Sequence, residues 1–314
     1  MRTWLILVFV GLAVLLALAL ALAPVDLGRA SSYAASHPFE VALALVAYTG
    51  SFALRAMSWR PLVGARVPLA KLFTLLMGAL FLNHAAPAKA GDLARMYALS
   101  RGWVPAEWAV VSVVLGRLVD LVGLLAVLVA SWTLVGAGGW EKVSPFVLAV
   151  IGAALALFLL TRSKLPAFLE ARFGTIAWHV GRVQAALRKS TWTALLESFA
   201  FAVPVWVLEA GILWVVGRGL GLGLSPAQVV AATCFAVLVA AVPLTPGSLG
   251  TYEAGMGAIL LVFGVPAELA FAAAVTTHAM KFLYALAAAP FAFREGLAVI
   301  RKGEVKHDEA GVEV

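Results

Sequence analysis

The apolar residues of this chain fall into long runs with few charges, a pattern that is typical of a membrane protein. A helix needs about 20 apolar residues to cross a bilayer. Runs of about this length cover residues 4–23, 39–57, 108–135, 144–161, 193–217 and 267–293. The pattern predicts an all-α polytopic membrane protein with about six spanning helices. We expect a single integral membrane domain over residues 1–303 and a disordered cytoplasmic tail over residues 304–314.

Shorter apolar segments lie between the long runs as two broken hairpins. The first has an arm at residues 72–86 and then the break Pro87-Ala-Lys-Ala-Gly91-Asp92. The second has arms at residues 228–242 and 254–263 around a break that runs from Pro243 to Glu253. Both breaks contain Pro-x-x-x-Gly followed by a carboxylate, and arms of about 10 to 15 residues are too short to span a bilayer. Such broken segments at matching places in two halves indicate a binding site in a transporter-like fold.

The basic residues predict how these segments are oriented in the membrane. Most of the 23 Lys and Arg residues fall in segments that would lie on one side, among them Arg55 and the basic cluster in residues 162–190. Because basic loops stay in the cytoplasm, we expect both termini there. The first hairpin would then enter the membrane from the cytoplasm and the second from outside. Two oppositely oriented re-entrant hairpins are what an inverted repeat produces.

Composition excludes a soluble protein and limits the chemistry. The chain is 63% hydrophobic and 12% charged, with a mean hydropathy of +1.00. A single cysteine, Cys234, excludes a disulfide framework, and the five His residues lack metal-ligand spacing. No nucleotide-binding or nucleophile motif occurs. We therefore expect no enzyme activity and no metal or other cofactor. We also expect no nucleic-acid partner, because the basic residues of the predicted cytoplasmic loops account for the net charge of +7.

Two segments each allow two interpretations. Residues 4–23 have features of a signal peptide, with a cleavage site near residues 21–23, but the run is longer than a typical signal sequence. Its length favours a retained first span. Residues 165–190 combine basic charge with apolar residues at helical spacing. This segment is either an amphipathic helix on the cytoplasmic leaflet or a basic helix packed on the protein.

Charged residues inside the apolar runs are candidates for a binding site, because a charge in hydrocarbon is costly. Glu209 and Lys281 stand within long runs, and Glu253 lies in the first turn after the second break. Arg117 and Asp120 share one helix face, where they form either part of the site or a structural pair that neutralises itself. We expect Glu253 and Lys281 to face one interior cavity.

The breaks supply the remaining candidates. Asp92 would begin a short helix and cap its free N–H groups. Lys89 and Arg95 flank it and could bind a lipid phosphate at the helix N-terminus, or could extend to the headgroups as topology charges. Asn83 and His84 could bind the broken backbone or a ligand. The hydroxyl-bearing candidates of the second break are Thr245 and Tyr252.

These motifs resemble those of the lysylphosphatidylglycerol synthase transmembrane-region family, also described as flippase-like membrane proteins. The early pattern of that family, an Asn, a Pro and Gly-acid-x-x-Arg, is matched between Asn83 and Arg95. Its Arg and Asp three residues apart are matched by Arg117 and Asp120. The late pattern Pro-x-x-Pro-Gly-x-x-Gly-x-x-Glu is the more specific and is matched by residues 243–253.

Two positions depart from the family pattern. Asp92 stands where Glu is usual, and Lys281 stands where Arg is usual. Both keep the charge but change the reach and hydrogen-bond geometry of the side chain. In the best-known members this region precedes a cytosolic aminoacyl-transferase domain and is held to move lysyl-phosphatidylglycerol between leaflets. The chain as given ends at Val314, so the resemblance implies a stand-alone translocating half without synthase activity.

The resemblance thus implies a flippase-like lipid translocase of a bacterial cytoplasmic membrane. Its expected partners are membrane lipids with charged headgroups and, in addition, a lipid-biosynthesis enzyme. Two alternatives stay open at this point. One is a non-catalytic membrane partner of a lipid-modifying enzyme, and the other is a small-solute or ion-coupled transporter. The lipid, the direction of movement, the energy source and the oligomeric state do not follow from the sequence.

Overall fold

The structure, a computed structural model, describes residues 27–64, 66–86, 89–136, 191–241 and 245–294, together with short stretches between residues 141 and 187. The described residues are almost entirely helical, and no strand occurs among them. Four helices are long and apolar enough to cross a membrane, in agreement with a multi-pass membrane protein. They are α3 (Pro38–Val63), α6 (Ala106–Val135), the helix Trp192–Gly219 that contains α10 (Trp192–Glu209) and α11 (Gly211–Gly219), and α14 (Ala267–Ala287), which continues to Arg294.

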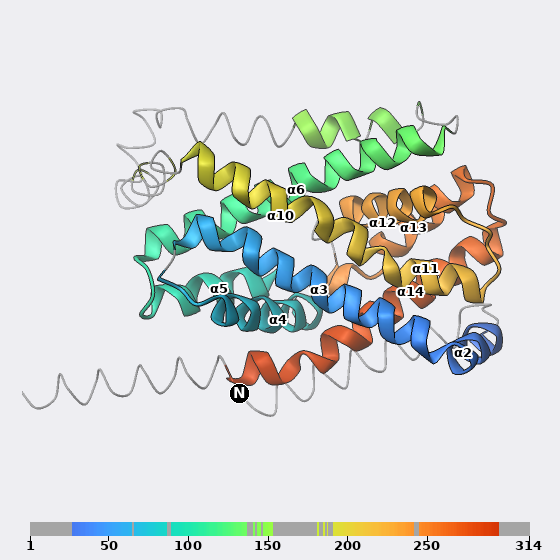
Figure 1. The fold of residues 1–314 in the computed structure, drawn as a ribbon, viewed down its shortest axis with the longest axis horizontal. Coiled ribbons are helices and arrows are strands. Elements are labelled where there is room, and N and C mark those ends of the chain that lie inside the picture. The colour runs from blue at the N-terminus through green and yellow to red at the C-terminus, as the bar shows by residue number, and fades with distance from the viewer. Residues whose placement is uncertain are drawn as a thin grey trace, which may run out of the picture.

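Two pairs of shorter apolar helices occupy the places of the predicted broken hairpins. They are α4 (Leu69–Ala85) with α5 (Ala90–Ser100), and α12 (Pro226–Ala240) with α13 (Thr251–Val262), whose connection contains η1 (Pro246–Ser248). The two helices of each pair pack against each other. Figure 1 shows α4 and α5 toward one end of the long axis and α12 and α13 toward the other. The helix pairs are confirmed, whereas their insertion into a membrane as re-entrant hairpins stays a prediction.

In each of these helix pairs, a glycine allows the two helices to approach each other closely. A Cβ atom added at Gly91 of α5 would collide with the backbone of Ala79 in α4. A Cβ atom added at Gly255 of α13 would lie 2.9 Å from the Cβ of Val239 in α12. Real Cβ atoms do not approach so closely, so the two helices of each pair can reach this separation only because glycine stands there. The glycines of the two halves therefore have the same packing role.

The local sequence explains where the second pair begins and why both pairs are broken. Ser225 accepts a hydrogen bond from the Gln228 amide at 3.3 Å, and Gln228 accepts one from the Ser225 amide at 2.8 Å, a capping box that starts α12. Lys89 and Ser248 are the non-glycine residues with positive φ in the described part of the chain, at 52° and 60°. A left-handed conformation costs about 1–2 kcal/mol for such residues. Each break therefore contains one strained residue that the surrounding contacts hold in place.

The long helix Trp192–Gly219 is interrupted near its middle, although the sequence predicts one continuous run there. α10 ends at Glu209 and α11 begins at Gly211. Pro204, which lies one and a half turns before the end of α10, has no N–H group and removes one helical hydrogen bond. The interruption places Glu209 at a helix junction. It is here that the charged centre described below is built.

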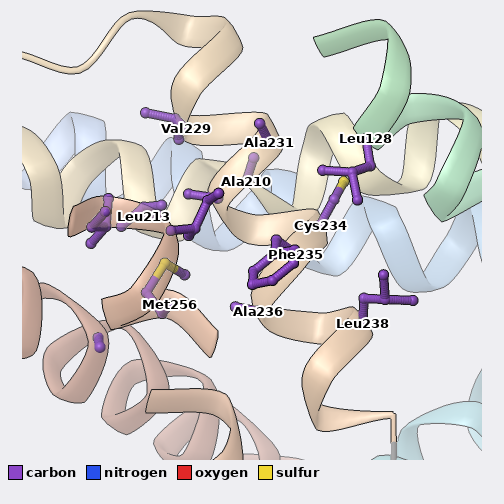
Figure 2. Close-up of a cluster of buried hydrophobic side chains, with 14 of the residues drawn as sticks. Leu128, Ala210, Leu213, Val229, Ala231, Cys234, Phe235, Ala236, Leu238 and Met256 are labelled. Atoms are coloured by element: carbon purple, nitrogen blue, oxygen red, sulfur yellow. The ribbon is translucent and has the colours of Figure 1, made fainter. Parts of the chain in front are cut away.

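Buried apolar side chains fix α12 and α13 against their neighbours. Figure 2 shows Leu128 of α6 beside Cys234 of α12, with Met256 of α13 and Leu213 of α11 in the same cluster. These four side chains are fully buried. A second cluster joins α3, α4 and the N-terminal part of α6, and includes Phe81 and Trp59. The two clusters hold the helix pairs at fixed positions around the space between them.

Several sequence predictions lie outside the described residues. They concern the first run at 4–23, most of the run at 144–161, most of the basic segment at 165–190, and the tail at 304–314. One assignment of a basic residue also needs correction. Arg55 was expected among the cytoplasmic residues after the second run. Because α3 continues to Val63, Arg55 instead lies within this helix. The helix tolerates this charge because the guanidinium is buried against carboxylates of other helices.

Candidate functional site

The two breaks and the long helices enclose one cavity of about 580 Å³. Of the twelve candidates named from the sequence, eleven line it, and these come from both helix pairs and from α6, α10 and α14. The lining candidates are Asn83, His84, Lys89, Asp92, Arg95, Arg117, Asp120, Glu209, Thr245, Tyr252 and Lys281. Glu253 is the exception, because it contacts a lining residue, His278, without lining the cavity itself.

Glu209 is the centre of the buried ion pairs. One oxygen accepts a hydrogen bond from the Lys281 ammonium at 2.8 Å, and the other accepts one from the Arg55 guanidinium at 2.8 Å. Arg55 also lies 3.7 Å from Asp120, so the chain of charges joins α14, α10, α3 and α6. All four side chains are largely buried. The arrangement satisfies the requirement that charges buried in a protein interior be paired.

Aromatic rings complete the surroundings of these cations. The Lys281 ammonium lies 5.0 Å from the centre of the Tyr252 ring and 5.7 Å from that of Tyr48. The Arg55 guanidinium lies 4.7 Å from the centre of the Trp206 ring. Cation–π contacts of this kind stabilise a cation that has lost part of its water shell. They show how this site holds two cations beside one central carboxylate.

A second cluster of charges lies at the first break. Arg117 donates two hydrogen bonds to Asp92, from Nε at 2.9 Å and from Nη2 at 2.8 Å, and Arg95 lies 3.1 Å from the same carboxylate. The intrahelix pair of Arg117 with Asp120, one of the two interpretations of their spacing, is wrong. Each residue instead pairs with another helix, Arg117 with α5 and Asp120 with Arg55 of α3.

Two further expectations for the first break are corrected. Asp92 begins a short helix as predicted, but its carboxylate binds Arg117 and Arg95, and the N-cap residue of α5, Lys89, makes no side-chain capping bond. Asn83 accepts a hydrogen bond from the Gly91 amide at 2.9 Å and satisfies the broken backbone instead. Arg95 does not extend to the headgroups, because its side chain is buried and stacks on Trp59 at 4.7 Å.

The polar side chains of the second break mostly bind their own backbone. Thr245 donates to the Leu249 carbonyl at 2.7 Å, and Ser248 donates to the Ala240 carbonyl at 3.1 Å. Glu253 accepts a hydrogen bond from the Gly250 amide at 2.8 Å and caps the start of α13. Its other oxygen lies 2.7 Å from Nδ1 of His278. The prediction that Glu253 faces the cavity together with Lys281 is therefore wrong, since Glu253 is used for capping and for positioning His278.

The second break touches the end of α4, directly before the first break. A Cβ atom added at Gly247, which has a φ of 61°, would lie 2.6 Å from the Phe282 ring and 3.3 Å from the His84 carbonyl oxygen. The His84 ring stacks edge-on against Phe282, with 5.0 Å between the ring centres, and lies 6.5 Å from His278. η1 and α4 are therefore in direct contact at the cavity. The second break therefore lies against the last turn of α4, three residues before the first break begins.

Arg55 is the site residue that sequence reasoning missed. Its position inside the apolar run at 39–57 was the available signal, because a charge in such a run needs a partner. His278 lies three residues before Lys281, and its contact with Glu253 depends on the tertiary fold. Within the described residues, no group of three or more His, Cys, Asp or Glu side chains could hold a metal ion.

The long apolar helices and this charged cavity define a polytopic membrane protein with a polar interior site. Residues 4–289 match the family described as Lysylphosphatidylglycerol synthase TM region, and the chain belongs to that family. Membership associates it with membrane lipid metabolism or transport. Comparison with curated proteins and with solved structures finds no match.

Proposed function

We propose that this protein is a translocase that moves a polar-headgroup lipid between the leaflets of a bacterial cytoplasmic membrane. The observation that carries the proposal is a charged cavity to which both breaks contribute. Its volume of about 580 Å³ is in the usual range of ligand pockets, roughly 300–1,000 Å³. The headgroup would occupy this cavity while the acyl chains remain in the lipid.

The arrangement of the two helix pairs supports this proposal. They lie toward opposite ends of the long axis (Figure 1), and residues from both breaks line the cavity. We propose that the α4–α5 pair enters the membrane from the cytoplasm and the α12–α13 pair enters from outside, with both chain termini in the cytoplasm. A headgroup could then reach the same site from either leaflet as the two halves move against each other.

We further propose that the protein makes or breaks no covalent bond in the lipid. The support is the sequence, in which no nucleotide-binding or nucleophile motif occurs. The cavity instead offers paired charges and aromatic rings, groups that bind and orient a polar molecule. Mass spectrometry of the lipid after translocation should therefore find its mass unchanged.

Movement can be tested by blocking the cavity without changing its charge. Ala241 lines the cavity and is exposed, so Ala241→Trp should obstruct the cavity at its mouth. Ala254→Trp is the matched control, because Ala254 is an exposed residue of α13 that does not line the cavity. The measurement is the rate at which NBD-labelled phosphatidylglycerol becomes accessible to dithionite in proteoliposomes.

We expect translocation by the parental protein and by Ala254→Trp, and a loss to the protein-free rate in Ala241→Trp. Equal rates in parental proteoliposomes and protein-free liposomes, for phosphatidylglycerol and for other headgroups, would refute the proposal. Lipid binding without movement would favour the alternative of a membrane partner for a lipid-modifying enzyme. A folded Ala241→Trp variant with the parental rate would exclude this cavity as the route.

A further inference from the structure

The charges that line the cavity are not balanced. The lining cations are Arg55, Lys89, Arg95, Arg117 and Lys281, and the lining carboxylates are Asp92, Asp120 and Glu209. Five cations thus face three carboxylates. Glu253 does not reduce the surplus, because it lies outside the lining and binds His278 and its own helix terminus. The position of the two surplus charges decides what the cavity can bind.

The charges around Glu209 balance one another. Glu209 and Asp120 provide two carboxylates, and Arg55 and Lys281 provide two cations. The oxygens of Glu209 are each 2.8 Å from one of these cations. Both cations are also covered by aromatic rings. The charges in this part of the cavity therefore balance one another, and no external ion is needed to neutralise them.

The surplus lies at the first break. Asp92 is the lining carboxylate there, and both of its oxygens are occupied by Arg117, with Arg95 at 3.1 Å from one of them. The Lys89 ammonium makes no hydrogen bond or ion pair with any residue in the described part of the chain. The N-terminus of α5 adds partial positive charge at the same place. One carboxylate thus stands against three cations and the positive end of a helix dipole.

One of these cations is also accessible. The side chain of Arg117 is 43% exposed, although it lies near the middle of the long apolar helix α6. An exposed cation at membrane depth is costly unless an anion or water accompanies it. A guanidinium that already uses one edge for Asp92 can still donate from its remaining N–H groups, and an ammonium such as that of Lys89 has three donors. Phosphate oxygens suit both groups.

The two helices that carry Asp92 and Arg117 also have exposed apolar side chains. Leu93 and Tyr97 of α5 and Val122 of α6 are more than half exposed. Ala241 and Thr245, at the end of α12 and in the second break, line the cavity and are exposed. An opening with charged groups inside and apolar side chains on the adjacent helix faces suits a molecule with a charged head and hydrocarbon tails.

We infer that the first break binds the phosphate of a net-anionic lipid through Lys89 and Arg117, and that the cavity selects such lipids over net-cationic ones. This inference rests on the proposed translocase function and names its substrate class. A cationic headgroup, such as that of lysyl-phosphatidylglycerol, would bring further positive charge to a place that already has a surplus. The group that the site binds is the phosphate ester, and a membrane lipid supplies that group.

Binding is measured with purified protein in nanodiscs of phosphatidylcholine that contain phosphatidylglycerol or lysyl-phosphatidylglycerol, by native mass spectrometry. Soluble sn-glycerol 3-phosphate is added as a separate arm. The variants are Lys89→Gln, which removes the cation, and Lys89→Arg, which keeps it. Arg60→Gln is the control, because Arg60 is an exposed cation of α3 outside the cavity.

We expect phosphatidylglycerol to bind more tightly than lysyl-phosphatidylglycerol. Lys89→Gln should weaken phosphatidylglycerol binding about tenfold, the usual scale for one charge-assisted hydrogen bond. Lys89→Arg and Arg60→Gln should bind within about twofold of the parental protein, because the cavity keeps its charge in both. If Lys89→Gln does not fold, the preference of the parental protein between the two lipids still tests the inference.

Equal binding of the two lipids, a preference for the cationic lipid, or parental affinity in folded Lys89→Gln would overturn the inference. Binding of glycerol 3-phosphate without binding of phosphatidylglycerol would overturn the lipid as the source of the phosphate. Failure of the proposed function would give a different result. A charge preference that depends on Lys89, without leaflet-to-leaflet movement in proteoliposomes, would support this binding site and refute the translocase.

Discussion

Glu209 shows how one residue determines the interior of this protein. Its two oxygens each bind a cation, and the cations come from α14 and α3 on either side of it. Each ion loses several kcal/mol of hydration on burial, so the pairs add little net stability compared with an apolar interior. Their effect appears when one partner is removed and the others stay buried. Glu209 is the most sensitive position because two cations depend on it.

A double-mutant cycle tests this dependence. Glu209→Gln should lower the free energy of unfolding by about 3–5 kcal/mol, because it leaves Lys281 and Arg55 with one carboxylate fewer. Lys281→Met should cost less, since Glu209 keeps Arg55. The double variant should be more stable than the sum of the single effects predicts, by about 1–3 kcal/mol. Thermal or chemical unfolding in detergent provides the measurement.

Glu40→Gln is the matched control for that cycle. Glu40 is a partly exposed carboxylate of α3, 3.6 Å from Arg218, and its loss should cost at most about 1 kcal/mol. Additive effects of Glu209→Gln and Lys281→Met would contradict the direct coupling of the two residues. An equal cost for Glu40→Gln and Glu209→Gln would mean that burial gives Glu209 no special weight.

The helices themselves were largely predictable, and their side-chain partners were not. Pro and Gly mark both breaks, so the short helices begin and end within a few residues of the predicted arms. Local pattern does not give the partner of a charge. Arg117 stands three residues before Asp120 yet binds Asp92, which lies on another helix. The interruption after Glu209 was not predicted either, although Pro204 within the run was a signal for it.

The glycine that closes the first helix pair gives a prediction at the scale of an element. Gly91→Ala should destabilise the protein by about 1–3 kcal/mol, because the added methyl group collides with the Ala79 backbone and forces α4 and α5 apart. Gly257→Ala in α13 is the control, since nothing lies within 4 Å of its added Cβ atom. That change should stabilise the helix by up to about 1 kcal/mol. Unfolding midpoints in detergent should move in opposite directions, and a shared direction would show that the close approach of α4 and α5 is not required.

At the scale of the whole molecule, the two halves have matching parts. Each half has a helix pair closed by a glycine and broken at a residue with positive φ, Lys89 in one and Ser248 in the other. The second break meets the first helix pair where Gly247 lies against His84 of α4. Their charges are unequal, because the first break has surplus cations while the second uses its polar groups on its own backbone. The fold thus combines repeated architecture with a site that is specialised in one half.

The membrane orientation gives the last prediction. α6 and α14 begin with exposed alanines, Ala106 and Ala267, which the distribution of basic residues assigns to opposite sides of the membrane. After the buried cysteine is removed by Cys234→Ala, a membrane-impermeant thiol reagent should label Ala267→Cys in intact cells. It should label Ala106→Cys only after the membrane is opened, since that residue would face the cytoplasm. Labelling of both from the same side would be incompatible with helix pairs that enter from opposite faces. The reverse pattern would keep the opposite orientation of the pairs and place the surplus cations of the first break at the outer leaflet.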